Sequence, residues 1–374
     1  MKKIVLSICA LFFVFASPLS AFEWGGLITN DTGAIIATTP AASSTTISQS
    51  NGVSIWFNNP IGEDFALSGE VLYKYNLKIP TQGNSTFINI VDLPLFKFSG
   101  ETQAGSGILG VNAGRFAYVD NAGAIVSGTI DGAAIDYSVS IVKIGLFGGY
   151  SGLLNTLNNT SLARADVTKE ANLYDFAYQY APLGLSVELP YLFGNQSLGI
   201  QAYTILDCGK NDPKQNLTYA SLALSGPITN IIYYSLASSL GFIDFKDLMN
   251  FTEFSLLVFP TQEISINAGV EVSPVINNTY YYSPLASKTG GQITPKANFT
   301  YGTDTMCFDL GAKYILAYNI ADKNYAGKSF DLNAGFVYNV FSDLQVGLSG
   351  TASIDTTEAK SNSYTANLNI ALAF

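Results

Sequence analysis

Apolar and polar residues alternate along the last part of the chain. From Tyr364 to Phe374 every even position is apolar, and Thr365, Asn367 and Asn369 stand between them. A β-strand turns successive side chains to opposite faces. This pattern therefore predicts a strand with one apolar face and one small, mostly polar face.

The same alternation recurs over much of the chain. It is clearest in residues 65–79, 264–272, 306–318, 330–340 and 344–354, and each run is about as long as a tilted membrane strand. Pro94 interrupts a weaker run and predicts a bend there, because proline donates no ladder hydrogen bond. The weaker candidate strands are residues 22–30, 51–58, 87–98, 107–119, 132–140, 142–151, 174–189, 197–207, 216–225, 230–240 and 251–259.

The links between the clearest strands alternate in length. Residues 302–304 and 341–343 read as tight turns, whereas residues 273–291, 319–328 and 355–362 are longer and polar. Short turns at one end and longer loops at the other are typical of outer-membrane barrels, whose long loops face outward.

Composition separates a membrane barrel from other membrane proteins. The chain is 48% hydrophobic and 12% charged, whereas soluble domains are about 25% charged. No apolar stretch of about 20 residues follows the leader, so the apolar residues are dispersed by alternation. We therefore expect an all-β fold, a transmembrane antiparallel up-and-down β-barrel of about 16–18 strands. A soluble β-sandwich is the alternative, and its exposed face would carry more charge.

The first residues read as a targeting segment. Lys2 and Lys3 precede an apolar run from Ile4 to Phe15, and small residues end at Ala21. This arrangement predicts a signal peptide over residues 1–21 that is removed on export. The mature chain is then residues 22–374, and we expect it to form a single transmembrane barrel domain.

Charge and residue usage exclude several function classes. The chain has 28 acidic and 18 basic residues, which argues against a nucleic-acid partner. It has no histidine, so neither histidine-based catalysis nor a histidine metal site is available. We expect no enzyme activity, no cofactor and no metal site. Cys208 and Cys307 are expected to be unpaired, at opposite ends of the barrel.

The residues on the polar face of each predicted strand are expected to line the lumen. Charges are costly on the lipid side, so a charged inner face implies water inside. Most of the predicted lining residues are carboxylates, which favours passage of cations; the alternative is that these charges only hydrate or brace the lumen. Arg115 is expected either to bind a carboxylate or to line a constriction. The predicted lining residues are Glu70, Lys74, Lys78, Arg115, Glu188, Glu253, Glu263, Glu271, Lys296, Asp309, Lys313 and Asp331.

Taken with the leader and the repeated strands, the terminal strand resembles those of bacterial outer-membrane porins. This resemblance implies outer-membrane lipid and the barrel-assembly machinery as partners, with an assembly signal formed by Tyr364, Leu368, Ile370, Leu372 and Phe374. A second, shorter resemblance is to porin-like proteins of spirochaetes. It rests on residues 113–116, Asp120 and residues 131–132.

Three functions are compatible with these patterns. The first is an outer-membrane porin for passive diffusion of small hydrophilic solutes, with a modest cation preference and homo-oligomers left open. The second is a transporter of hydrophobic compounds, with residues 31–50 as a hatch in the barrel. The third is a surface adhesin that binds through residues 273–291.

Overall fold

The computed structural model of the chain describes eight ranges of residues: 22–123, 127–150, 180–208, 216–243, 247–273, 291–319, 324–357 and 360–374. The predicted signal peptide and residues 274–290 of the proposed adhesin segment lie outside these ranges, so both stay predictions. No helix within the ranges is long and apolar enough to span a membrane.

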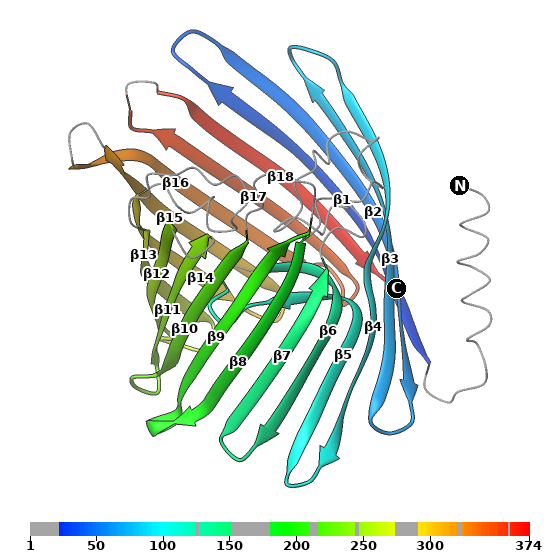
Figure 1. Cartoon of the computed structure of the whole chain (residues 1–374). Helices are drawn as coiled ribbons and strands as arrows, with labels where there is room; N and C mark the ends of the chain where they lie inside the picture. The colour runs from blue at the N-terminus through cyan, green and yellow to red at the C-terminus, as the bar shows by residue number, and fades with distance from the viewer. Residues whose placement is uncertain are drawn as a thin grey trace.

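The described residues form one ring of eighteen antiparallel strands, in which each strand pairs with the next and the last pairs with the first (Figure 1). The predicted all-β up-and-down barrel is therefore confirmed. In chain order the strands are β1 (Glu23–Thr38), β2 (Ser43–Ile61), β3 (Phe65–Pro80), β4 (Thr86–Ala104), β5 (Gly107–Val119), β6 (Ser127–Val139), β7 (Val142–Tyr150), β8 (Tyr180–Leu192), β9 (Gln196–Asp207), β10 (Leu217–Pro227), β11 (Ile232–Ile243), β12 (Asp247–Val258), β13 (Ile264–Ser273), β14 (Gln292–Gly302), β15 (Met306–Asn319), β16 (Asn324–Asn339), β17 (Leu344–Asp355) and β18 (Asn362–Ala373).

A seam between β1 and β18 closes the ring. Their ladder runs from Leu27 opposite Ala373 to Thr38 opposite Asn362. At its end the backbones of Gly26 and Phe374 exchange two hydrogen bonds, of 2.9 and 3.0 Å. Because a lipid bilayer offers no partner for free N–H and C=O groups, only a closed sheet of this kind can cross it.

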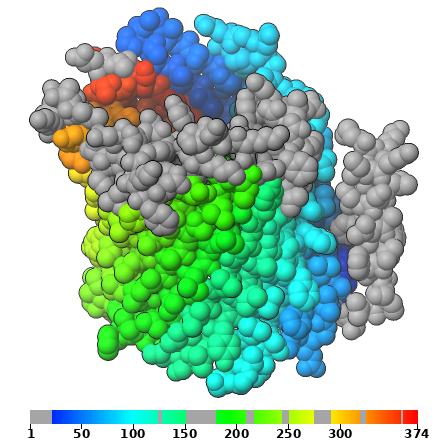
Figure 2. All heavy atoms as spheres, in the orientation of Figure 1, coloured from blue at the N-terminus to red at the C-terminus, as the bar shows by residue number. Residues whose placement is uncertain are grey.

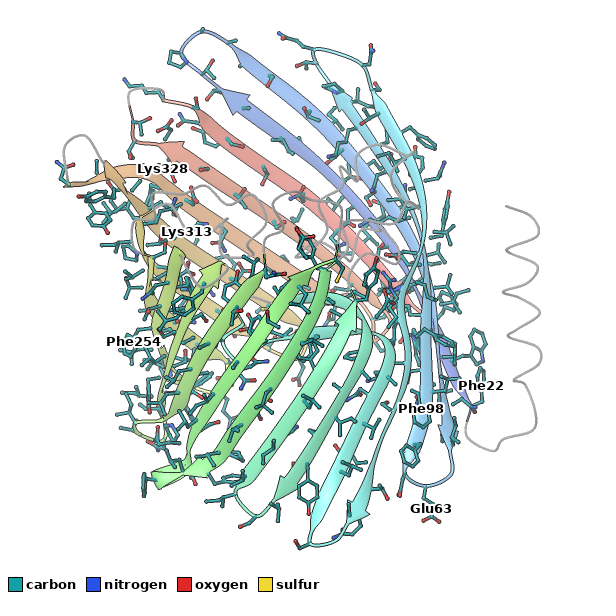
Figure 3. The ribbon with its side chains drawn as sticks, in the orientation of Figure 1. Phe22, Glu63, Phe98, Phe254, Lys313 and Lys328 are labelled. Carbon is teal, nitrogen blue, oxygen red and sulfur yellow. The ribbon has the colours of Figure 1, made fainter. Side chains whose placement is uncertain are left out.

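The two faces of the sheet differ in chemistry. Large apolar side chains stay exposed on the outer face, for example Leu310, Leu348 and Ile370. Figure 3 shows Phe22 and Phe254 pointing away from the ring, and Figure 2 shows the outer surface of β5 to β11 as a continuous packed wall. The opposite face carries the charged residues described below. This outer face is the one that a bilayer would cover.

The links at one end of the barrel, which we call the turn end, are short; those at the other we call the loop end. The turn end includes Gly62–Asp64, which carries Glu63 in Figure 3, and the 3-10 turn Phe193–Asn195. Two expectations were wrong here. Residues 319–328 are not a long link, since β15 runs to Asn319 and β16 begins at Asn324. Residues 31–50 are not a hatch, since β1 and β2 take them into the wall.

Pro94 lies at an irregular point of the wall, as predicted. The ladder between β3 and β4 shifts register between Glu70 and Leu72, opposite Asp92 and Leu95. A bulge of this kind takes up the residue that cannot donate a hydrogen bond.

One hairpin bends out of the wall into the barrel. The ladder between β4 and β5 ends at Phe96 opposite Arg115, but β5 and β6 stay paired as far as Val119 opposite Ser127. We call this extension, residues 115–123 and 127–131, the inner hairpin. Its turquoise end lies inside the ring of strands in Figure 1, and its hydrogen bonds to β9 are described below.

Candidate channel lumen

Strand register places most of the predicted lining residues on the inner face. On β3, for example, Glu70, Lys74 and Lys78 alternate with outward-facing residues such as Tyr73. The predicted residues on this face are Glu70, Lys74, Lys78, Glu188, Glu253, Glu271, Lys296, Asp309, Lys313 and Asp331. That set contains six carboxylates and four lysines.

Two predicted residues lie elsewhere. Glu263 is exposed in the turn before β13, and its carbonyl accepts a hydrogen bond of 2.8 Å from Gly302 N–H. The apolar alternation of β13 extends by chance into this turn, so the period alone misplaces Glu263. Arg115 lies at the base of the inner hairpin and is only 4% exposed.

A three-residue cluster joins β12, β13 and β14. The ammonium group of Lys296 donates to Glu253 Oε1 at 2.6 Å and to Glu271 Oε1 at 2.7 Å. The three side chains are 27–29% exposed, so water reaches them. One lysine shared by two carboxylates leaves the cluster with a net negative charge.

A second charged pair continues this patch along the inner wall. Lys313 Nζ lies 3.3 Å from Asp331 Oδ2, and Ser353 donates to the other carboxylate oxygen at 2.5 Å. In the ladder Lys313 stands directly opposite Lys296. The charged patch of β12–β16 is therefore continuous, and its carboxylates are held in place by hydrogen bonds.

The wall around the β1–β18 seam carries the carboxylate of Asp31 among neutral polar side chains. Asn369 donates to Asp31 at 2.5 Å across the seam. Thr351 and Thr365 share a hydrogen bond of 2.6 Å between their hydroxyl groups. These short polar side chains leave room inside the ring and can hydrogen-bond water or a polar solute.

Arg115 binds the carboxylate of Asp131, its neighbour across the β5–β6 ladder. Nη1 of Arg115 lies 3.2 Å from Asp131 Oδ2 and 3.4 Å from Oδ1, so a single guanidinium nitrogen makes both contacts. Of the two roles that the sequence left open, the geometry favours the brace. A side chain that is 4% exposed presents little surface to a passing solute.

The inner hairpin packs against the barrel wall through apolar side chains. Phe116 and Ile130 form a buried cluster with Phe147 of β7, and Leu95 of β4 packs against it. The rings of Tyr118 and Phe147 stack with their centroids 3.9 Å apart. The base of the hairpin is therefore fixed to the inner surface.

The sequence analysis missed residues that contact this hairpin, such as Phe147 and Gln201 of β9, which accepts a hydrogen bond from Asn121 N–H. Both follow the strand alternation, and nothing local distinguishes them from other inner-face positions. The glycines at 114, 132 and 149 were the available signal, since glycine within a strand often marks a bend. That signal can be recognised only when the strand register is known.

Within the described ranges both Cys208 and Cys307 are free, and no group of acidic and cysteine residues could hold a metal ion.

No protein-family model and no curated protein matches the chain. Its fold does match solved outer-membrane channels. OccK7 (OpdD) of Pseudomonas aeruginosa aligns with a TM-score of 0.61 and 7% identity, over 95% of this chain and 99% of that one. OccAB4 of Acinetobacter baumannii aligns with a TM-score of 0.58 and 9% identity, over 96% and 100% of the two chains.

A third match is OpdK of Pseudomonas aeruginosa, solved with vanillate, at a TM-score of 0.56 and 8% identity over 94% of this chain and 99% of that one. At such identities the likeness concerns the fold. The resemblance to spirochaetal proteins gains no support and stays a prediction. The fold of this chain is that of the outer-membrane porins, an 18-stranded transmembrane barrel.

Proposed function

We propose that this protein is a channel of a bacterial outer membrane through which small hydrophilic solutes diffuse passively. The observation that carries the proposal is the contrast between the two faces of one closed sheet, an apolar outer face and a charged inner one. Rings of this strand number are wide enough to leave an aqueous channel. The structural neighbours, which are outer-membrane channels, support the same function.

We further propose a modest preference for cations. Among the predicted lining residues that lie on the inner face, the six carboxylates outnumber the four lysines, and the Lys296 cluster keeps a net negative charge. Fixed carboxylates along a pore attract cations and repel anions. By this criterion a cationic solute should pass more readily than an anionic one such as vanillate.

The partners follow from the same proposal. They are outer-membrane lipid around the apolar face, the barrel-assembly machinery during insertion, and small solutes in the lumen. Assembly into homo-oligomers stays open. We expect neither enzyme activity nor a cofactor.

Recording in a planar bilayer tests the proposal. The purified protein should give stepwise conductance and, in a salt gradient, a reversal potential of the sign expected for cations. A protein that inserts but never conducts would exclude a channel. A reversal potential of the sign expected for anions would exclude only the cation preference.

Replacing Lys296 by Met tests the source of the selectivity. The change removes the cation that Glu253 and Glu271 share, so the reversal potential should move further toward cation selectivity. Replacement of Lys360, which is exposed outside the strands, serves as the matched control and should change little. Equal reversal potentials for the two variants and the unmodified protein would show that the cluster does not face the ion path.

Transport of hydrophobic compounds is the less favoured alternative. It needs an apolar inner pocket and a hatch. The apolar residues Phe116, Ile130 and Phe147 are already packed against one another, and residues 31–50 lie in the wall.

A further inference from the structure

The bend of the inner hairpin is built from three glycines in register. Gly114 of β5 stands opposite Gly132 of β6, which stands opposite Gly149 of β7. A Cβ atom on Gly114 would lie 2.2 Å from the carbonyl oxygen of Phe96, and one on Gly132 would lie 2.3 Å from that of Gly148. Only glycine allows the backbones to approach this closely, so the row bends the hairpin inward.

Apolar packing holds the hairpin only near its base. Beyond Tyr118 the chain turns, with Gly123 N–H donating to the carbonyl of Asp120 at 2.8 Å and Ala122 N–H donating to its carboxylate at 3.2 Å. The described residues of this turn bury no large apolar side chain. Asp120 in this turn is only 3% exposed, so polar groups rather than apolar side chains attach the end of the hairpin to the wall.

Gln201 of β9 makes two hydrogen bonds to this end. Its carboxamide oxygen accepts a hydrogen bond of 2.8 Å from Asn121 N–H, and its amide nitrogen donates to Tyr118 Oη at 2.7 Å. The side chain is 1% exposed. Gln201 and Asn121 are 80 residues apart in the chain, so these bonds join the hairpin to a different part of the wall.

The other side of the hairpin faces the open lumen. Along β5, Phe116 and Tyr118 face the wall, whereas Ala117 and Val119, which alternate with them, are exposed, Val119 to 57%. The position of the hairpin end therefore decides how much of the lumen stays open on this side.

We propose that Gln201 is the positioning residue that holds the inner hairpin against β9 and thereby sets the width of the channel. This inference rests on the proposed function, because width matters only if solutes pass. It concerns uncharged residues, so its test is conductance and solute size rather than the sign of the reversal potential.

Replacing Gln201 by Leu tests the inference, since leucine is of similar size but makes neither hydrogen bond. Without these bonds the hairpin end moves away from the wall into the lumen, so the variant should show a lower single-channel conductance and admit only smaller neutral polymers than the unmodified channel. Gln345→Leu is the matched control: Gln345 also lies on the inner face, but it is exposed near the turn end and bonds to Asn339. The control should keep the original conductance.

A disulfide supplies a second test that can restore the original state. A Cβ atom on Gly199 would lie 3.5 Å from that of Asn121, within the usual Cβ separation of a disulfide. Asn121→Cys and Gly199→Cys, combined with Gln201→Leu in a background with Cys208→Ser and Cys307→Ser, should therefore cross-link on oxidation. The oxidised channel should regain the original conductance, and reduction should lower it again.

The outcomes separate the two proposals. If the unmodified protein never conducts, the proposed function fails, whereas cross-linking on a gel still reports whether the hairpin end lies against β9. If the unmodified protein conducts and Gln201→Leu matches it, or if oxidation leaves the variant's conductance unchanged, the role of Gln201 is wrong. If the Gln201→Leu protein does not fold, the cysteine pair is tested in the protein that keeps Gln201. That pair should cross-link without changing the conductance, and failure to cross-link would overturn the proposal.

Discussion

At the scale of the residue, position in the ladder decides what a side chain meets. Ile370 and Asn369 are neighbours in β18, yet Ile370 is 37% exposed on the apolar face, while Asn369 donates to Asp31 across the seam. Strand geometry alone separates them. Replacement by a charged residue should therefore affect stability differently at the two sites.

Ile370→Lys should lower the free energy of unfolding by about 2–4 kcal/mol, because it places a charge on the lipid-facing side. Asn369→Lys should be tolerated, since the new ammonium group faces water and lies near the carboxylate of Asp31. Denaturant titration of both variants in lipid vesicles measures the difference. Equal losses would contradict the assignment of the two faces.

At the scale of the element, period-two alternation predicted most strands but not their ends. Runs such as residues 306–318 and 344–354 were found nearly to their bounds, because each has one face against lipid. The first hairpin was predicted poorly: only residues 22–30 and 51–58 were recognised, whereas β1 and β2 extend much further. Small polar residues such as Thr32 and Ser48 blur the alternation there.

The inner hairpin could not be predicted from alternation at all. Phe116 and Tyr118 keep strand parity, but the strand turns away from the wall, so the parity no longer states which side meets lipid. The bend depends on three glycines that meet only when the register is known. Arg115 lies at the base of this hairpin. The sequence therefore placed it on the correct strand, but it could not decide between binding a carboxylate and lining a constriction.

Gly114→Ala should disturb this bend. Gly114 has a φ of +117°, and an L-residue held in such a conformation costs about 1–3 kcal/mol; the close carbonyl oxygen of Phe96 adds to that cost. We expect a lower midpoint of denaturant unfolding and an altered conductance.

Gly302→Ala is the control for this change, because a Cβ atom there would meet nothing within 4 Å. The control should keep both the midpoint and the conductance. A Gly114→Ala protein as stable as the control would show that the bend does not need glycine.

At the scale of the whole molecule, the seam that closes the ring ends at Phe374. The ring of Phe374 covers Gly26, where a Cβ atom would lie 2.2 Å from it, and the two backbones are joined by hydrogen bonds. The predicted assembly signal therefore coincides with the seam. The sequence predicted the signal by resemblance, but the partner strand, more than 300 residues away in the chain, could be assigned only from the structure.

Phe374→Ala should lower the fraction of protein that assembles in cells, as measured by the gel mobility of unheated samples. Phe341→Ala is the matched control, since Phe341 is an exposed aromatic residue in a turn. If the residue is read by the assembly machinery, refolding of the purified variant in detergent should suffer less than assembly in cells. Equal assembly of both variants in cells would exclude a special role for Phe374.

Closing the seam also has an entropic cost, which is incurred in a single step. Bringing together segments as distant as Asp31 and Asn369, 338 residues apart, costs about 5 kcal/mol in chain entropy, and nothing is recovered until the last ladder forms. Before that moment both terminal strands expose a free edge that can recruit a foreign strand. Afterwards no edge remains, so the circumference cannot grow, shrink or exchange a strand with a neighbouring molecule.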